Sequence, residues 1–222
     1  MNTRGMFRGL LALAAAAWAP VASANLITNG DFSAGNAGFA SGYTYVSPTP
    51  NTSCWPEGTY TVGTDPNACH YLWTSFGDHT SGAGNMMIVN GAPSANVSVW
   101  SESSIGVQAN TQYTFTGWVA STYPSSPASL NFFIDGAQVG AFTSSTAPGQ
   151  WQQFSASWFS GTNTSATLSI FDQNLDRGGN DFALDDLSFD AVPEPNAALW
   201  LMGALVLVVR QRSRRALVRQ RY

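Results

Sequence analysis

The feature that most restricts the fold is a series of short segments in which hydrophobic and polar residues alternate. The segment YTFTGWVAS places Tyr113, Phe115 and Val119 on one face and Trp118 with two threonines on the other. A period of two is that of a half-buried β-strand. Three further segments alternate in this way: SLNFFIDG (129–136), QFSASWF (153–159) and ATLSIFD (166–172). No stretch between 25 and 190 has a helical period over ten residues, so we expect one all-β domain, a sandwich or barrel.

The charges are distributed unevenly along the chain. There is no lysine, and Arg177 is the one arginine between residues 9 and 209, whereas all thirteen acidic residues lie between Asp31 and Glu194. A middle of this kind repels phosphate backbones, so we do not expect nucleic-acid binding.

The N-terminus has the pattern of an export signal. Arg4 and Arg8 form a positive region, residues 10–18 are apolar, and Ala22-Ser23-Ala24 matches an A-x-A cleavage site. The pattern predicts a signal peptide over 1–24 and a mature chain that begins at Asn25; the alternative is an ordinary buried helix.

Cys54 and Cys69 are the two cysteines of the chain. An exported protein meets an oxidising compartment, which favours a disulfide between them, although two free thiols are the alternative. Both lie in a proline-rich segment, residues 42–81, that shows little alternation and reads as a long excursion held by one bridge. Aromatic residues in it either form a ligand-binding surface or pack as a small satellite core: Trp55, Tyr60, Tyr71 and Trp73.

The C-terminus combines an apolar run with a basic tail, VPEPNAALWLMGALVLVVRQRSRRALVRQRY. Residues 197–209 carry no charge, and as a helix they would span about 20 Å at 1.5 Å per residue, which is short for a hydrocarbon core of about 30 Å. The six arginines in 210–222 would hold the end in the cytoplasm, leaving 25–190 outside. The alternative is a basic amphipathic tail on a membrane surface.

This order of features resembles the PEP-CTERM sorting signal of Gram-negative bacteria. The resemblance covers residues 191–222, with Pro193, Glu194 and Pro195 as the sorting motif, 197–209 as a transmembrane helix and 210–222 as an arginine-rich tail. It implies an exosortase as partner, processing near the motif, and passage from the envelope membrane to the cell surface or extracellular matrix.

The ends of the 25–190 domain carry a second resemblance. NLITNGDFSAG at the start and NDFALDDLSF at the end are similar to the first and last strands of jelly-roll carbohydrate-binding modules, whose termini pair side by side. The resemblance implies a jelly-roll β-sandwich and a structural Ca²⁺ held by Asp31 and Asp185, with Asp186 beside them. Many such modules have Glu after the phenylalanine where this chain has Ser33, so the alternative is that Asp31 caps a turn and Asp185 and Asp186 form a polar bulge.

The sequence gives little support to catalysis. Asp78, His79 and Ser81 are the nearest approach to a triad, but Ser81 lies in no recognisable nucleophile motif, and a polar loop is the simpler interpretation. Two non-catalytic functions therefore remain open. One is binding of carbohydrate or exopolysaccharide on aromatic side chains, with Trp118, Trp55 and Trp73 as candidates and Phe133 and Phe171 as further aromatics on polar faces. The other is a purely structural surface or matrix protein.

Overall fold

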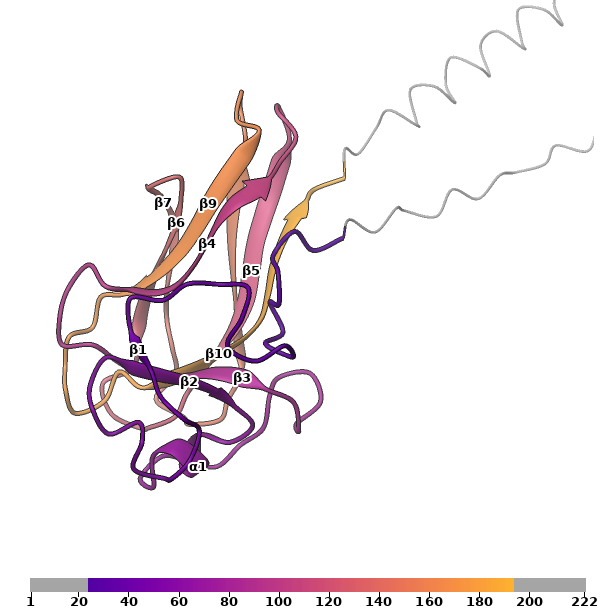
Figure 1. The fold of residues 1–222 in the computed structure, drawn as a ribbon. Helices are drawn as coiled ribbons and strands as arrows, with labels where there is room; N and C mark the ends of the chain where they lie inside the picture. Colours follow the sequence, from indigo (N-terminus) through magenta and orange to yellow (C-terminus); the bar gives the residue numbers. More distant parts are fainter. Residues whose placement is uncertain (1–23, 194–222) are drawn as a thin grey trace, which may run out of the picture.

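The domain is a sandwich of two β-sheets, as a computed structural model covering residues 24–193 shows (Figure 1). One sheet has six strands, in the order β1 (Thr44–Tyr45), β2 (Thr59–Gly63), β3 (Met86–Asn90), β10 (Phe182–Ala191), β5 (Gln112–Ser121) and β8 (Gln152–Phe159). The other has four, in the order β4 (Ser98–Gly106), β9 (Ser165–Asp172), β6 (Ser129–Ile134) and β7 (Ala137–Thr143). The all-β prediction is confirmed, and within 24–193 the one helix is the four-residue α1 (Pro66–Cys69).

The four predicted strands are present and face the way their alternation indicates. They are β5, β6, β8 and β9, and their hydrophobic positions point between the sheets. The predicted turn at Asp135-Gly136 joins β6 to β7, with both residues at positive φ. β5 is central in its sheet, paired antiparallel with β10 on one side and β8 on the other.

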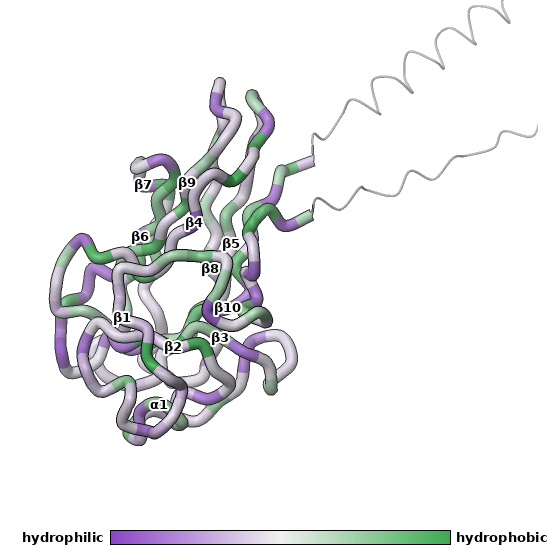
Figure 2. Tube along the Cα trace, viewed as in Figure 1, coloured by the Kyte–Doolittle hydropathy of each residue, from purple (hydrophilic) through white to green (hydrophobic). Residues whose placement is uncertain are grey.

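Aromatic rings join the two sheets across the core. Phe115 of β5 lies with its ring centroid 5.5 Å from Phe154 of β8 and 6.0 Å from Phe132 of β6, and the last two rings stack at 4.1 Å. Figure 2 shows hydrophobic positions along the strands and hydrophilic ones gathered in the loops. Each such fully buried ring contributes about 1.5–3 kcal/mol relative to an exposed one, so this contact is a main element of the sandwich.

The excursion over 42–81 is partly stranded and is closed by a disulfide between Cys54 and Cys69, as predicted. The Cα atoms of the two cysteines are 5.3 Å apart. The bridge belongs to a second, smaller core on the outer face of the six-stranded sheet, together with Trp73 and with Met86 and Ile88 of β3. Figure 1 shows this region, with α1, at one end of the sandwich.

The start and the end of the described chain lie side by side. Leu26 donates its amide to the carbonyl of Phe189, and Leu187 donates to the carbonyl of Gly30. The Asn25 side chain strengthens this junction, since its amide donates to Leu187 and its oxygen accepts from Phe189. The side-by-side pairing of the termini is therefore confirmed, although residues 25–30 form no regular strand.

The predicted signals at the two ends are not part of this description. The signal peptide up to residue 23 and the sorting signal from Glu194 onward, with the apolar run 197–209, lie outside the described residues. Between 24 and 193, no helix has the length and apolar character needed to cross a membrane.

Candidate functional site

A cleft of about 190 Å³ opens at the end of the sandwich that carries α1. Five separate parts of the chain meet there: the stretch before β2, the stretch after α1, the end of β3, the stretch after β5 and the loop that leads into β10. Its lining residues are Trp55, Glu57, His70, Leu72, Trp73, Asn90, Tyr123, Arg177, Gly178, Gly179 and Asp181.

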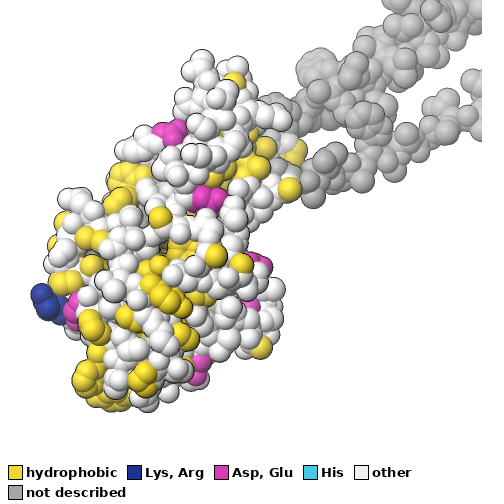
Figure 3. All heavy atoms as spheres, viewed as in Figure 1, with side chains coloured by type: hydrophobic (Ala, Val, Ile, Leu, Met, Phe, Trp, Pro, Cys, Tyr) yellow, Lys and Arg dark blue, Asp and Glu magenta, His cyan; other side chains and the backbone are white. Residues whose placement is uncertain are grey.

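Beside the cleft lies an exposed aromatic platform, formed by Trp55, which also lines the cleft, and Tyr71, which does not. Trp55 is 52% exposed and Tyr71 46%, and their ring centroids lie 5.7 Å apart. The disulfide explains the pairing, because Cys54 precedes Trp55 and Cys69 lies two residues before Tyr71. The chain between the two cysteines includes α1. Asp65 is the N-cap of this helix, and its side chain accepts a hydrogen bond from the Asn67 amide. Figure 3 shows hydrophobic side chains gathered at this end of the molecule.

The floor of the cleft is formed by buried side chains. Trp73 is only 3% exposed, its ring stacks on His70 with centroids 4.6 Å apart, and its indole N–H donates to Asp181 Oδ2 at 3.1 Å. Asn90 is buried and donates to the carbonyl of Cys54 at 2.6 Å. Trp55 and Trp73, both predicted as ligand-binding residues, therefore meet at one cleft, Trp55 as an open surface and Trp73 as part of its floor.

Two carboxyl groups in the cleft have raised pKa values. The pKa of Asp181 is raised to about 7. Burial is the main cause and the nearby Glu57 charge adds to it, whereas the hydrogen bond from Trp73 lowers the pKa. Burial also raises the pKa of Glu57, which the positive charge of Arg177 partly offsets. Glu57 Oε2 and Asp181 Oδ1 are buried oxygens with no hydrogen-bond partner among the described residues. A buried carboxylate oxygen without a partner is costly, so both favour a ligand that donates hydrogen bonds.

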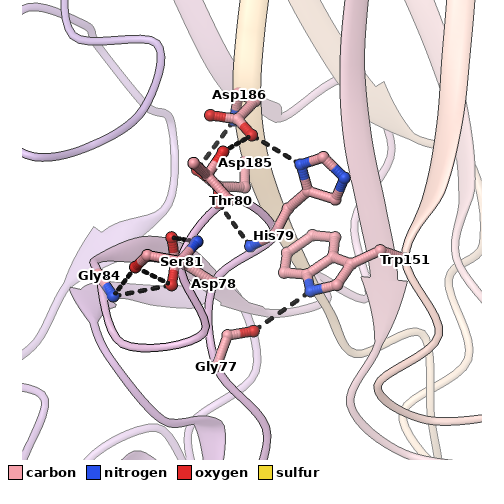
Figure 4. Close-up of polar contacts among 9 residues, drawn as sticks. All are labelled: Gly77, Asp78, His79, Thr80, Ser81, Gly84, Trp151, Asp185 and Asp186. Carbon is pink, nitrogen blue, oxygen red and sulfur yellow. Dashed lines mark hydrogen bonds and ion pairs between the residues drawn. The ribbon is translucent and has the colours of Figure 1, made fainter.

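Trp118, the third predicted ligand-binding residue, lies elsewhere and is covered. It stands on the outer face of β5, and the His79 ring stacks on it with centroids 3.8 Å apart. His79 is held in place from β10, since its backbone amide donates to Asp185 and its Nδ1 lies 2.7 Å from Asp186 Oδ2 (Figure 4). Phe133 and Phe171 pack edge to face against each other. His79 therefore covers one face of Trp118, whereas the contact between Phe133 and Phe171 covers one face of only one of these two rings.

The Asp78, His79 and Ser81 group does not form a triad. Ser81 donates its hydroxyl to Asp78 at 2.9 Å, and Asp78 also accepts the amides of Ser81 and Gly84 (Figure 4). The imidazole of His79 faces Asp186 and Trp118 instead. The group closes a tight loop, as the simpler interpretation of the sequence predicted.

The predicted calcium residues each have hydrogen-bond partners of their own. Asp31 Oδ1 accepts from the amide and the hydroxyl of Ser33, and Asp185 accepts from the amides of His79 and Asp186. The hollow beside Asp31 is lined by Asp186 rather than Asp185, and the β10 register shifts at this point. Within 24–193 no three His, Cys, Asp or Glu side chains are grouped to share a metal. Because Ca²⁺ takes six to eight oxygens, these residues fit it poorly, and calcium binding stays a prediction.

Sequence reasoning did not identify Glu57, Asn90, Arg177 or Asp181 as site residues. They come from four parts of the chain that only the folded sheet brings together. One signal was present, since Arg177 is the single cation of an acidic domain and stands in the polar stretch DQNLDRGGND. An isolated arginine among aspartates and glycines indicates a loop whose positively charged side chain has a functional role.

Comparisons with known proteins concern the fold alone. No protein-family model matches the sequence, and no curated protein matches it. Among solved structures, the N-terminal CBM22-1–CBM22-2 tandem domain of Xyn10C from Paenibacillus barcinonensis matches with a TM-score of 0.50 and 17% identity over 82% of this chain and 49% of that one. An arabinose-bound GH51 α-L-arabinofuranosidase, MgGH51, matches with a TM-score of 0.50 and 12% identity over 77% and 27%.

The chain therefore spans about half of the tandem structure and about a quarter of the arabinofuranosidase. At these identities the likeness concerns the architecture and not the activity. Together with the two facing sheets and the paired termini, it shows that residues 24–193 form an all-β sandwich of the kind found in carbohydrate-binding modules.

Proposed function

We propose that this domain is a glycan-binding module that acts outside the cell, at the surface or in an extracellular matrix. The observation that carries the proposal is the open Trp55 and Tyr71 platform beside a cleft with polar groups on its floor. A sugar ring has apolar faces that pack on aromatic rings and hydroxyl groups that need hydrogen-bond partners, and this cleft supplies both. The proposal assigns no catalytic step to the domain.

The test is binding of the full-length chain, kept in a mild detergent, to a broad panel of glycans. Replacing Trp55 with alanine should weaken binding at least tenfold, because the platform loses its largest exposed ring. Phe159→Ala is the matched control, since Phe159 is 57% exposed at the end of β8 and does not line the cleft. Equal losses in both variants, or no binding to any glycan, would contradict the proposal.

A structural role without a ligand is the second candidate. It is favoured by the packing of Trp118 under His79, which covers one face of a ring that the sequence predicted as a ligand-binding residue. Failure of the whole glycan panel would support this role.

We also propose that the chain reaches the surface through its two ends. In this proposal residues 1–24 are removed on export, the run 197–209 holds the protein in the envelope membrane, and an exosortase processes it near Pro193, Glu194 and Pro195. The support is the sequence pattern of the two ends together with a domain whose described termini are adjacent. Both ends can therefore face the same membrane while the domain folds.

Cell fractionation in a host with the sorting machinery tests this pathway. The Glu194→Ala protein should remain membrane-bound and uncleaved, whereas an Asn196→Ala control should be processed like the wild type. Mass spectrometry of the released wild-type protein should show an N-terminus at Asn25. Normal release of the Glu194→Ala protein would leave the apolar run as a plain membrane anchor.

A further inference from the structure

The cleft described above holds two carboxyl groups whose hydrogen-bonding capacity is not used. Asp181 is 8% exposed and Oδ2 accepts from Trp73, but Oδ1 has no well-aligned partner within 24–193, although the Gly91 amide lies near enough to lower the pKa of the carboxyl. Glu57 Oε2 lines the same cleft and is also buried without a partner there. Both residues line the cleft, so a group that reaches these oxygens satisfies them only if it donates hydrogen bonds, and it gains most if it is positively charged.

The charge around the cleft favours the same kind of group. Residues 24–193 contain twelve carboxylates and one guanidinium, that of Arg177. Arg177 lies on the exposed rim, and the described residues place no carboxylate within 4 Å of it, since their one such ion pair joins His79 to Asp186. The cleft itself carries two carboxyl groups and one guanidinium, so the attraction of cations and the repulsion of sulfated or uronic-acid sugars come from the acidic domain around it.

Aromatic rings complete the surroundings. Trp55, Trp73 and Tyr123 all line the cleft together with the two carboxyl groups. Trp73 is buried with His70 stacked on it, so Trp55 is the exposed ring of the three, and an organic cation placed over Trp55 gains an electrostatic attraction that a neutral group lacks. The cavity of about 190 Å³ is smaller than the roughly 300–1,000 Å³ of pockets that enclose whole drug-sized ligands, so it admits one ring or one end of a chain.

We infer that the cleft binds an amino sugar, with the free ammonium between Glu57 and Asp181 and the sugar ring against Trp55. The inference rests on the proposed function, because it names the class of glycan for the same site. The inference makes a specific claim about charge. A cleft that recognises neutral sugars would bind the free amine and its acetylated form with similar affinity, whereas this cleft should prefer the free amine.

The experiment compares two ligands that differ at one position. The full-length chain in mild detergent is titrated at neutral pH with a β-1,4-linked glucosamine oligosaccharide and with its fully N-acetylated counterpart of equal length. The free amine should bind at least tenfold more tightly. That preference should shrink as salt is added, because it rests on charge.

Two isosteric variants connect the preference to the cleft. Glu57→Gln and Asp181→Asn should each reduce the preference for the amine at least fivefold. Asp135→Asn removes the same charge at the β6–β7 turn, at the other end of the sandwich from α1 (Figure 1), and should leave it unchanged. Glu57 is only partly buried, so Glu57→Gln tests the cleft without changing a fully buried residue.

The possible outcomes separate the two proposals. Equal affinity for both sugars, or a preference that survives both cleft variants, overturns the amino-sugar inference and leaves glycan binding standing. Tighter binding of a uronic-acid oligosaccharide overturns it as well. Absence of binding to these sugars and to every glycan of the panel overturns the proposed function itself.

Discussion

Lowering the pH from 7 to 5 should stabilise this protein, and Asp181 should account for a defined part of the effect. Burial raises the pKa of the Asp181 carboxyl to about 7 in the folded state, whereas an unfolded aspartate titrates near 3.9. The folded state therefore binds the proton more tightly than the unfolded state between these two values. Stability from this group is fully present below about pH 4 and is lost as the pH rises through about 7.

The magnitude follows from the two pKa values. Each pH unit in which the folded carboxyl is protonated and the unfolded one is not adds about 1.4 kcal/mol. Near pH 7 the folded group is already half titrated, so the gain from pH 7 to pH 5 is about 2 kcal/mol. For a domain of this size that free energy corresponds to a rise in Tm of about 4–8 °C.

The assay is thermal unfolding followed by circular dichroism at the two pH values, for the wild type and for Asp181→Asn. The variant cannot titrate at this position, so its gain on acidification should be smaller by about 2 kcal/mol, and it should be more stable than the wild type at pH 7. A remaining rise is expected in both proteins, because burial also raises the pKa of Asp185 to about 7. Identical pH dependence in the two proteins would refute the role given to Asp181.

Three further predictions concern the excursion and the junction. Replacing Cys54 and Cys69 with serine should cost about 3 kcal/mol, the value for a bridge that closes a loop of about 15 residues, and should weaken glycan binding; an unchanged midpoint in denaturant would contradict this. Gly30→Ala places a Cβ 2.0 Å from the carbonyl oxygen of Leu187 and should cost at least about 1–3 kcal/mol by thermal unfolding, whereas Gly106→Ala, with no atom within 4 Å, should cost less. If calcium joins the first and last segments, a chelator should lower Tm by mass action; no shift, with no calcium in elemental analysis, would remove that prediction.

Alternation predicts four strands that have one face on the main core, and two of the strands that it misses are buried on both faces. β5, β6, β8 and β9 lie with one face on the main core, so their residues alternate and were identified. Every residue of β2 and β3 is buried, because the disulfide-linked excursion covers their outer face. Alternation disappears in strands of that kind, and periodicity alone cannot detect them.

Only the aromatic residues of the candidate cleft were predictable from the sequence. Trp55 and Trp73 stand out in the sequence as tryptophans beside a disulfide, and both line the cleft. Asp181 does not stand out, because its environment comes from Trp73, 108 positions earlier, and from Glu57. Trp118 was a reasonable candidate on alternation, but a strand pattern cannot show that His79, from a distant loop, stacks on its ring.

The position of β10 has a mechanical consequence. Asp181, on the floor of the cleft, directly precedes β10, and the strand ends at Ala191, two residues before Pro193. A pull applied to a bound ligand, with the C-terminal tail held, would run along this one strand.

β10 is well placed to carry such a force. It is paired with β3 on one side and β5 on the other. The N-terminal segment adds backbone hydrogen bonds to Leu187 and Phe189, near the end of the strand. Tension along the strand therefore shears many hydrogen bonds at once instead of opening them one after another as in a zipper. If the tail anchors the domain while a ligand is bound, the rupture force measured between ligand and tail should exceed that measured when the same domain is pulled across its strands.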